Sequence, residues 1–176
     1  RNVLEIKRGK GTFIREDYTP KMVAGLEDTA SAKVDIDDLY EMRLIFEPEI
    51  AYYATIRASD RELERIFAIG KEIEELLLKG IDYTHKEMMF HCSIANATHN
   101  EFINQLEPVL HQSIEKGVYL YETEHIPVEQ VISEHRMIME FMKNRNAEGA
   151  RSAMRVHIMH AIDQLEINKN QGNNKA

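Results

Sequence analysis

The chain has 176 residues, of which 43% are hydrophobic and 30% charged, which is enough for one main domain with a solvated surface. The single cysteine, Cys92, excludes an internal disulfide and is typical of a reducing compartment. No apolar run approaches the roughly 18–20 residues that cross a bilayer, so we expect a cytoplasmic protein without a membrane partner.

Residues 1–15 predict a β-hairpin, because two β-rich runs flank a turn that contains Gly9 and Gly11. This segment carries five basic residues and one acidic residue, a net charge of +4, whereas the whole chain has −8 and the remainder therefore −12. The basic start predicts contact with an anion such as nucleic acid. Because an isolated hairpin is marginal in water, we expect it to belong to a larger domain and the sequence to be a fragment.

Residues 16–35 lack a sustained apolar stripe and are interpreted as a linker. Residues 36–170 predict an all-α domain, an antiparallel bundle of about six helices with short connections. Polar residues 171–176 are expected to form a disordered tail. The helices are expected at about 37–57, 59–79, 82–98, 101–121, 128–144 and 147–167.

Three histidines lie on apolar stripes of three different predicted helices. His135 falls between Ile132 and Ile138, and His157 lies in a comparable stripe of the last helix. His91 shares a helix face with Glu87, four residues earlier. Helices around one core point such stripes at one another, and a shared metal ion satisfies several buried imidazoles together.

The pattern therefore predicts a divalent metal site at Glu87, His91, His135 and His157. Three nitrogens and one oxygen suit Zn²⁺, Ni²⁺, Mn²⁺ or Fe²⁺ without choosing among them, and an octahedral ion would keep positions open for a small anion. His160 is a reserve ligand. The alternative is a structural module whose core histidines are bonded to backbone carbonyls.

Arg43 shares a face with Leu39 and Ile50, and an arginine on an apolar stripe needs an anionic partner. One candidate partner is Glu47, four residues on, and the other is the carboxylate of a ligand bound within the bundle. On the second interpretation, Arg43→Ala should abolish ligand binding and leave the bundle folded.

Several segments together resemble GntR-type transcriptional regulators of the FadR subfamily, with their helical FCD effector domain. "RGKGTFI" is similar to the wing of the family's winged helix-turn-helix, and "DLYEMRLIFEPEIAYYATIRAS" to the first effector-domain helix. "EMMFHCSIANATHN" and "SEHRMIMEFMKNRNAEGARSAMRVHI" are similar to the histidine-bearing helices.

The resemblance implies a metal held by His91, His135 and His157, with Glu87 where the family usually has Asp. It also implies a small carboxylic-acid effector at Arg43, a homodimer, and DNA contact through a mostly missing N-terminal domain, with Lys7, Arg8 and Lys10 in its wing. The expected function is therefore a metabolite-responsive transcriptional regulator. The alternative function is a mononuclear metalloenzyme in a helical bundle, for which Glu87 is the only evident candidate base.

Overall fold

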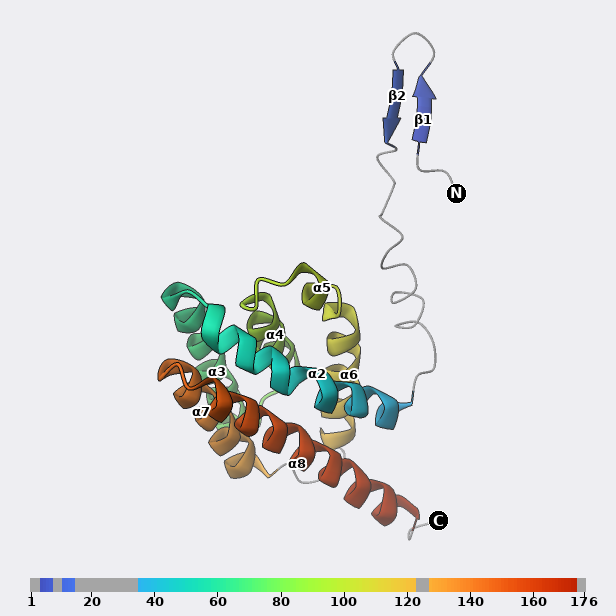
Figure 1. Ribbon diagram of the computed structural model, residues 1–176. Helices are drawn as coiled ribbons and strands as arrows, with labels where there is room; N and C mark the ends of the chain where they lie inside the picture. The colour runs from blue at the N-terminus through green and yellow to red at the C-terminus, as the bar shows by residue number, and fades with distance from the viewer. Residues whose placement is uncertain (1–3, 8–10, 15–34, 123–126, 174–176) are drawn as a thin grey trace.

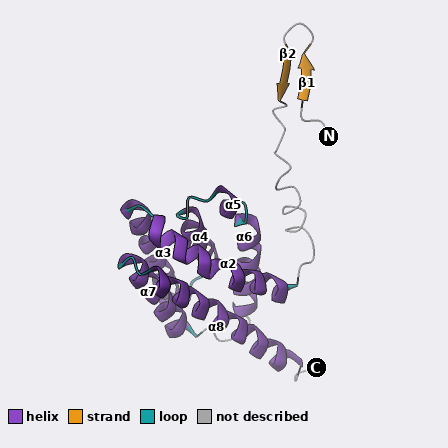
Figure 2. Ribbon diagram, in the orientation of Figure 1, coloured by secondary structure: helices purple, strands orange, loops and turns teal. Residues whose placement is uncertain are grey.

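The computed structural model describes residues 4–7, 11–14, 35–122 and 127–173 (Figure 1). Beyond residue 34 every described element is a helix, and the connections between helices are short (Figure 2). The elements are β1 (Leu4–Lys7), β2 (Gly11–Ile14), α2 (Ile36–Arg57), α3 (Asp60–Lys79), α4 (Thr84–Asn96), α5 (Glu101–Asn104), α6 (Glu107–Glu122), α7 (Val128–Lys143) and α8 (Ala147–Asn173). No helix in these ranges combines the length and apolarity needed to span a membrane.

The two short strands pair in antiparallel fashion, with Leu4 opposite Ile14 and Lys7 opposite Gly11. The predicted hairpin is therefore present. Its assignment to the wing of a DNA-binding domain stays a prediction, because Arg8, Lys10 and the side chain of Lys7 lie outside the described part of the chain.

The local signals at the helix ends act as the sequence predicts. Ser59 accepts a hydrogen bond from the backbone N–H of Glu62, and the Glu62 carboxylate accepts one from the Ser59 backbone, a capping box that starts α3. Gly80 ends this helix at a φ of 64°, a left-handed conformation that costs glycine little. These caps fix where α3 begins and ends, and its apolar stripe, which includes Ile66 and Ile73, sets the face that meets the core.

Two predicted boundaries differ from the structure. The helix expected at 101–121 is divided into α5 and α6 around Gln105 and Leu106. Pro108 carries no amide hydrogen for the carbonyl of Asn104, so a continuous helix would lose a hydrogen bond there. Helix α8 continues to Asn173, past the predicted end near 167, so residues 171–173 of the tail that was expected to be disordered are helical.

The bundle encloses one core, and α8 packs along α2 while also contacting α7. Helix α4 contacts α2, α3 and α6. Ala51 and Ala54 of α2 and Ala150 and Ala153 of α8 belong to the same apolar cluster and are fully or almost fully buried. Such small side chains permit close packing of the two helices, which are in contact. The core therefore places the inward faces of α2, α4, α7 and α8 near one another.

Arg145 joins the turn between α7 and α8 to the end of α2. Its guanidinium donates to the backbone oxygens of Thr55 at 3.2 Å and Ala58 at 2.5 Å, and to the Asp60 carboxylate at 2.7 Å. Carbonyls at a helix C-terminus lack partners within the helix, and a cation there also interacts favourably with the helix dipole.

We expect Arg145→Ala to lower the free energy of unfolding by about 1–2 kcal/mol, because it removes charged donors from two carbonyls at a partly exposed site. Chemical denaturation measures the change. Arg136→Ala is the matched control, since the exposed Arg136 pairs with the half-buried carboxylate of Glu74 in α3. Equal effects of the two substitutions would show that Arg145 does not cap α2.

Candidate metal centre

Four buried side chains from three helices converge inside the bundle. Glu87 and His91 come from α4, His135 from α7 and His157 from α8. Each offers one ligand atom, and these four atoms lie within 4.8 Å of one another. The imidazole centroids of His135 and His157 are 4.8 Å apart, and those of His91 and His157 are 5.4 Å apart. The structure thus brings together all four side chains that the stripes single out.

Two of the imidazoles are held by carboxylates on the side that faces away from the centre. His91 Nδ1 donates to Glu47, and His157 Nδ1 donates to Glu134 at 2.9 Å. Because an ionised carboxylate only accepts hydrogen bonds, these contacts place the proton on Nδ1. Nε2 of each ring therefore faces the centre, 3.1 Å from Oε1 of Glu87 for His91 and 3.7 Å from it for His157. A metal ion at the centre would take the Nε2 lone pairs, and carboxylates on Nδ1 are the usual way in which proteins orient metal-ligating histidines.

Two polar atoms at the centre have no hydrogen-bond partner, namely Oε2 of Glu87 and Nε2 of His135. Nε2 of His135 lies 3.3 Å from Oε1 of Glu87, but not in hydrogen-bonding geometry. Buried polar atoms are rarely left unsatisfied, and a cation among the four side chains would satisfy both. Ligand atoms about 2.0–2.2 Å from one ion lie at most about 4.4 Å apart. The four atoms here lie within 4.8 Å of one another, so small side-chain shifts would bring all of them within bonding distance of one ion. The residues present fit a divalent metal ion.

The charges at the centre also favour a cation. Burial raises the pKa of Glu87, but the neighbouring histidines outweigh burial and hold this pKa well below its usual value. Burial likewise lowers the pKa of His157, yet its hydrogen bonds to Glu134 and Glu87 outweigh burial and raise the pKa to about 9. The buried carboxylates thus stabilise a positive charge at the centre, which a proton on His157 or a metal ion can supply.

Arg43 lies on α2 beside this centre. Its Nε donates to Glu47, and Nη2 lies 3.4 Å from Nε2 of His91. Burial raises the pKa of Glu47, but Arg43 and His91 outweigh it and lower this pKa to about 2. The ring of Tyr40 lies 4.9 Å from the guanidinium carbon. The i+4 partner considered from the sequence is therefore present, and Glu47 connects Arg43 to the metal-centre residue His91.

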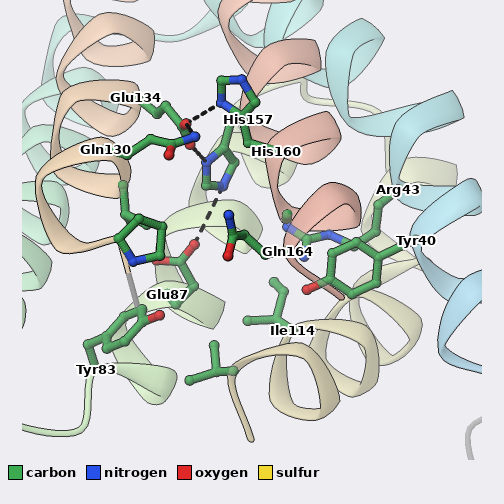
Figure 3. A pocket seen from close by; sticks show the side chains of 14 residues that line it. Tyr40, Arg43, Tyr83, Glu87, Ile114, Gln130, Glu134, His157, His160 and Gln164 are labelled. Atoms are coloured by element: carbon green, nitrogen blue, oxygen red, sulfur yellow. Dashed lines mark hydrogen bonds and ion pairs between the residues drawn. The ribbon is translucent and has the colours of Figure 1, made fainter. Parts of the chain in front are cut away.

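A cavity opens between Arg43 and the metal-centre residues (Figure 3). The volume within which the centre of a water molecule can lie is about 40 Å³, which is enough for a few waters. Figure 3 shows Tyr40 and Arg43 on one side, with Glu134, His157 and His160 across the space. The lining is Tyr40, Arg43, Tyr83, Glu87, Ile114, Val118, Pro127, Gln130, Val131, Glu134, His157, His160, Ala161 and Gln164. A guanidinium and two imidazoles facing a small, partly apolar space suit a small anionic ligand.

Some residues of the site take roles that differ from the sequence interpretation. His160, the reserve ligand, donates to Glu134 at 2.5 Å instead of joining the four side chains. Glu134 was missed, although it precedes His135 directly and is buried where α8 crosses α7. Glu47 was weighed only as a partner of Arg43, and its contact with His91 was missed. In both cases the signal was a carboxylate close to an apolar stripe.

This chain is similar to a known protein family and to several proteins named as transcriptional regulators. The family model described as "FCD domain" matches residues 38–160. The chain is 25% identical over 170 residues to the Bacillus subtilis protein named HTH-type transcriptional regulator LutR, covering 93% of this chain and 77% of that protein. It is 29% identical to the Escherichia coli protein named putative L-lactate dehydrogenase operon regulatory protein, covering 89% of this chain and 63% of that one.

Among solved structures, the one titled Streptococcus agalactiae GntR superimposes with a TM-score of 0.65 at 26% identity, covering 93% of this chain and 75% of the other. The structure titled E. coli McbR/YncC has a TM-score of 0.66 at 15% identity, which shows likeness of fold. These matches cover most of this chain, and the family model falls within the helical bundle.

Proposed function

Because the chain belongs to the FCD-domain family of GntR-type transcriptional regulators, we propose that its helical bundle senses a small organic acid through a metal ion and Arg43. In this proposal Glu87, His91, His135 and His157 hold one divalent ion, which is Zn²⁺, Ni²⁺, Mn²⁺ or Fe²⁺. The observation that carries the proposal is the buried, partly unsatisfied ligand set beside a cavity that also contains a guanidinium.

Each side chain has a distinct part in holding the ligand. When bound, the metal ion would supply positive charge and an open coordination position for an acid. Arg43 is kept charged and oriented by Glu47, so its remaining N–H groups can donate to a carboxylate in the cavity. The apolar side chains of Ile114 and Val131 also line the cavity and would contact the rest of the acid.

Recognition of an acid can control DNA binding only if the acid favours one arrangement of the protein over another. We propose that the hairpin of β1 and β2 is the wing of the DNA-binding domain, and that Lys7, Arg8 and Lys10 contact phosphates or the minor groove. Phosphate contacts of this kind position a protein on DNA without reading its sequence. Binding of the acid to the helical bundle would thus change how the DNA-binding domain, which includes the hairpin, contacts DNA.

Two alternatives considered from the sequence lose support. The relatives are named as transcriptional regulators, which does not favour a metalloenzyme. A purely structural set of core histidines would bond each ring nitrogen, whereas Nε2 of His135 has no hydrogen-bond partner.

Calorimetry with small acids tests the proposal. The name of the E. coli relative mentions L-lactate, so L-lactate and other two- to four-carbon acids form the first panel. We expect at least one acid to bind zinc-loaded protein, and to bind at least about tenfold more weakly after metal removal with a chelator. Lactamide is the matched control, because it has nearly the same shape without the charge. Equal binding of the acid with and without metal would contradict the proposal.

Glu134→Gln tests the support of His157. Glutamine keeps the size of the side chain but removes the charge that orients the imidazole, so we expect metal affinity to fall about 10–100-fold. Competition with a chromophoric chelator measures the affinity. Glu129→Gln on the exposed face of α7 is the control and should leave it unchanged. An unaltered affinity in Glu134→Gln would mean that this carboxylate has no role in the metal centre.

A further inference from the structure

A buried glycine, Gly117, lies inside helix α6 next to the cavity. Ile114 and Val118 of the same helix, four residues apart on one face, line the cavity, and Gly117 lies beside them. Glycine destabilises the interior of a helix relative to alanine. A buried glycine at such a position therefore indicates a close contact that a side chain would prevent.

The close contact of Gly117 is with Tyr40 of α2. A β-carbon at position 117 would overlap the hydroxyl oxygen of Tyr40 and would lie 2.8 Å from its Cζ and 3.1 Å from its Cε2. Carbon atoms that are not bonded to each other normally lie about 3.5–4.0 Å apart. Because Tyr40 is almost fully buried, its hydroxyl end occupies the space that a side chain at position 117 would need.

The ring of Tyr40 also contacts Arg43. Its centre lies 4.9 Å from the guanidinium carbon, and Figure 3 shows the two side chains next to each other at one edge of the cavity. Tyr40, Arg43 and Glu47 share one face of α2, because they are three and four residues apart. A guanidinium is attracted to the face of an aromatic ring. The ring of Tyr40 thus connects the backbone of α6 to the guanidinium of Arg43.

Three contacts together restrict the guanidinium of Arg43. Nε donates to Glu47, Nη2 lies 3.4 Å from Nε2 of His91, and the ring of Tyr40 covers one face. The two polar contacts lie at the edge of the guanidinium, so the ring is the contact that limits its tilt. A binding group that is already held in its bound orientation loses less entropy when the ligand arrives.

We infer that Tyr40 is a positioning residue, which packs against Gly117 and thereby holds the guanidinium of Arg43 toward the cavity. The inference rests on the proposed function in one respect, namely that Arg43 binds the acid. A side chain at position 117 would push the ring away from α6 and toward the cavity. Because the cavity has room for only a few waters, the displaced ring would release Arg43 and also take up space that the acid needs.

NMR of arginine side chains in the full chain tests the position of Arg43 without any acid. The Nε–H of Arg43 is buried and bonded to Glu47, so it should exchange slowly and give a resonance that Arg43→Lys removes. Gly117→Ala should move this resonance, because the nearby ring of Tyr40 shifts. Gly149→Ala is the matched control: a β-carbon there would lie 2.6 Å from Cγ of Phe141, outside the cavity lining. It should leave the resonance in place, and an unmoved resonance in Gly117→Ala would overturn the inference.

Calorimetry with L-lactate and zinc-loaded protein tests the consequence for binding. Gly117→Ala should weaken binding at least about tenfold, whereas Gly149→Ala should not. Tyr40→Phe keeps the ring and should bind within about threefold of the unaltered chain. Gly117→Ala combined with Tyr40→Phe should recover most of the affinity, because the overlap with the hydroxyl oxygen is gone. If no acid of the panel binds the unaltered chain, the proposed function fails, and the Arg43 resonance still decides the inference.

Two results of the calorimetry would contradict a positioning role for Tyr40. A tenfold loss in Tyr40→Phe would make the hydroxyl a direct contact of the acid, and an equal loss in Gly117→Ala and Gly149→Ala would reflect general loss of packing. Circular dichroism shows whether each variant is folded. Tyr40→Leu removes the ring without creating an overlap, so it should give the same shift and the same loss, and it replaces Gly117→Ala if that variant does not fold.

Discussion

Replacing Arg43 with alanine should lower the free energy of unfolding by about 3–5 kcal/mol and abolish binding of the acid. The sequence alone predicts loss of binding from a bundle that stays stable. The structure changes the first half of that prediction, because the Arg43 guanidinium is the main positive charge facing the buried carboxylate of Glu47. Without it, that carboxylate is left uncompensated in the core.

A double variant separates the two effects. Arg43→Met together with Glu47→Gln removes both charges, fills similar volume and leaves an acceptor for Nδ1 of His91. We expect it to recover most of the lost stability, since replacing a whole buried ion pair costs far less than removing one member. It should still fail to bind the acid. Urea denaturation gives the stability and calorimetry gives the binding.

Arg136→Ala is the control for loss of an arginine from the surface, and it should change neither quantity. Full acid affinity in Arg43→Ala, measured under conditions where the variant is folded, would remove Arg43 from the binding site. An unchanged free energy of unfolding in Arg43→Ala would mean that the buried carboxylate of Glu47 does not need the charge of Arg43.

Replacing His135 with alanine should weaken metal binding about 1000-fold, or about 4 kcal/mol, because one of four ligands is lost. The metal-free protein should be affected less. Burial lowers the pKa of His135, and its Nε2 has no hydrogen-bond partner, so the apo protein loses mainly packing against the ring of Phe90, 5.0 Å away. The substitution thus separates the metal contribution from ordinary core packing.

Thermal unfolding with and without zinc measures this difference, since a ligand that binds only the folded state raises the melting temperature. The unaltered protein and His85→Ala should both gain stability from zinc, because His85 is exposed on α4. His135→Ala should gain almost none at the same zinc concentration. An equal gain in all three proteins would place the ion elsewhere.

Much of the helical bundle could be predicted because its signals are local. The capping box at Ser59 and the left-handed glycine at Gly80 define α3 without reference to any other element. The division between α5 and α6 was missed, although Pro108 marks it, because the apolar spacing continues across the break. The length of α8 was underestimated, since polar composition alone does not end a helix.

The convergence of the four side chains could be predicted because each histidine replaces an apolar residue in a stripe, as His135 does between Ile132 and Ile138. The supporting carboxylates could not, because their burial is set by contacts between helices distant in sequence. From the sequence of α7 alone, Glu134 would be expected on the surface. It is buried because α8 packs against it and places His157 and His160 within hydrogen-bond distance. The cavity depends on the same crossings, so no single segment indicates it.

Anomalous diffraction from crystals of zinc-loaded protein tests the central claim most directly. The account predicts one strong peak at the zinc edge inside the bundle, about 2.0–2.2 Å from a carboxylate oxygen of Glu87 and from one nitrogen each of His91, His135 and His157. It also predicts that the peak disappears in His135→Ala crystals grown at the same zinc concentration. A peak held by other side chains, or no peak within the bundle, would contradict the metal centre on which the sensor proposal depends.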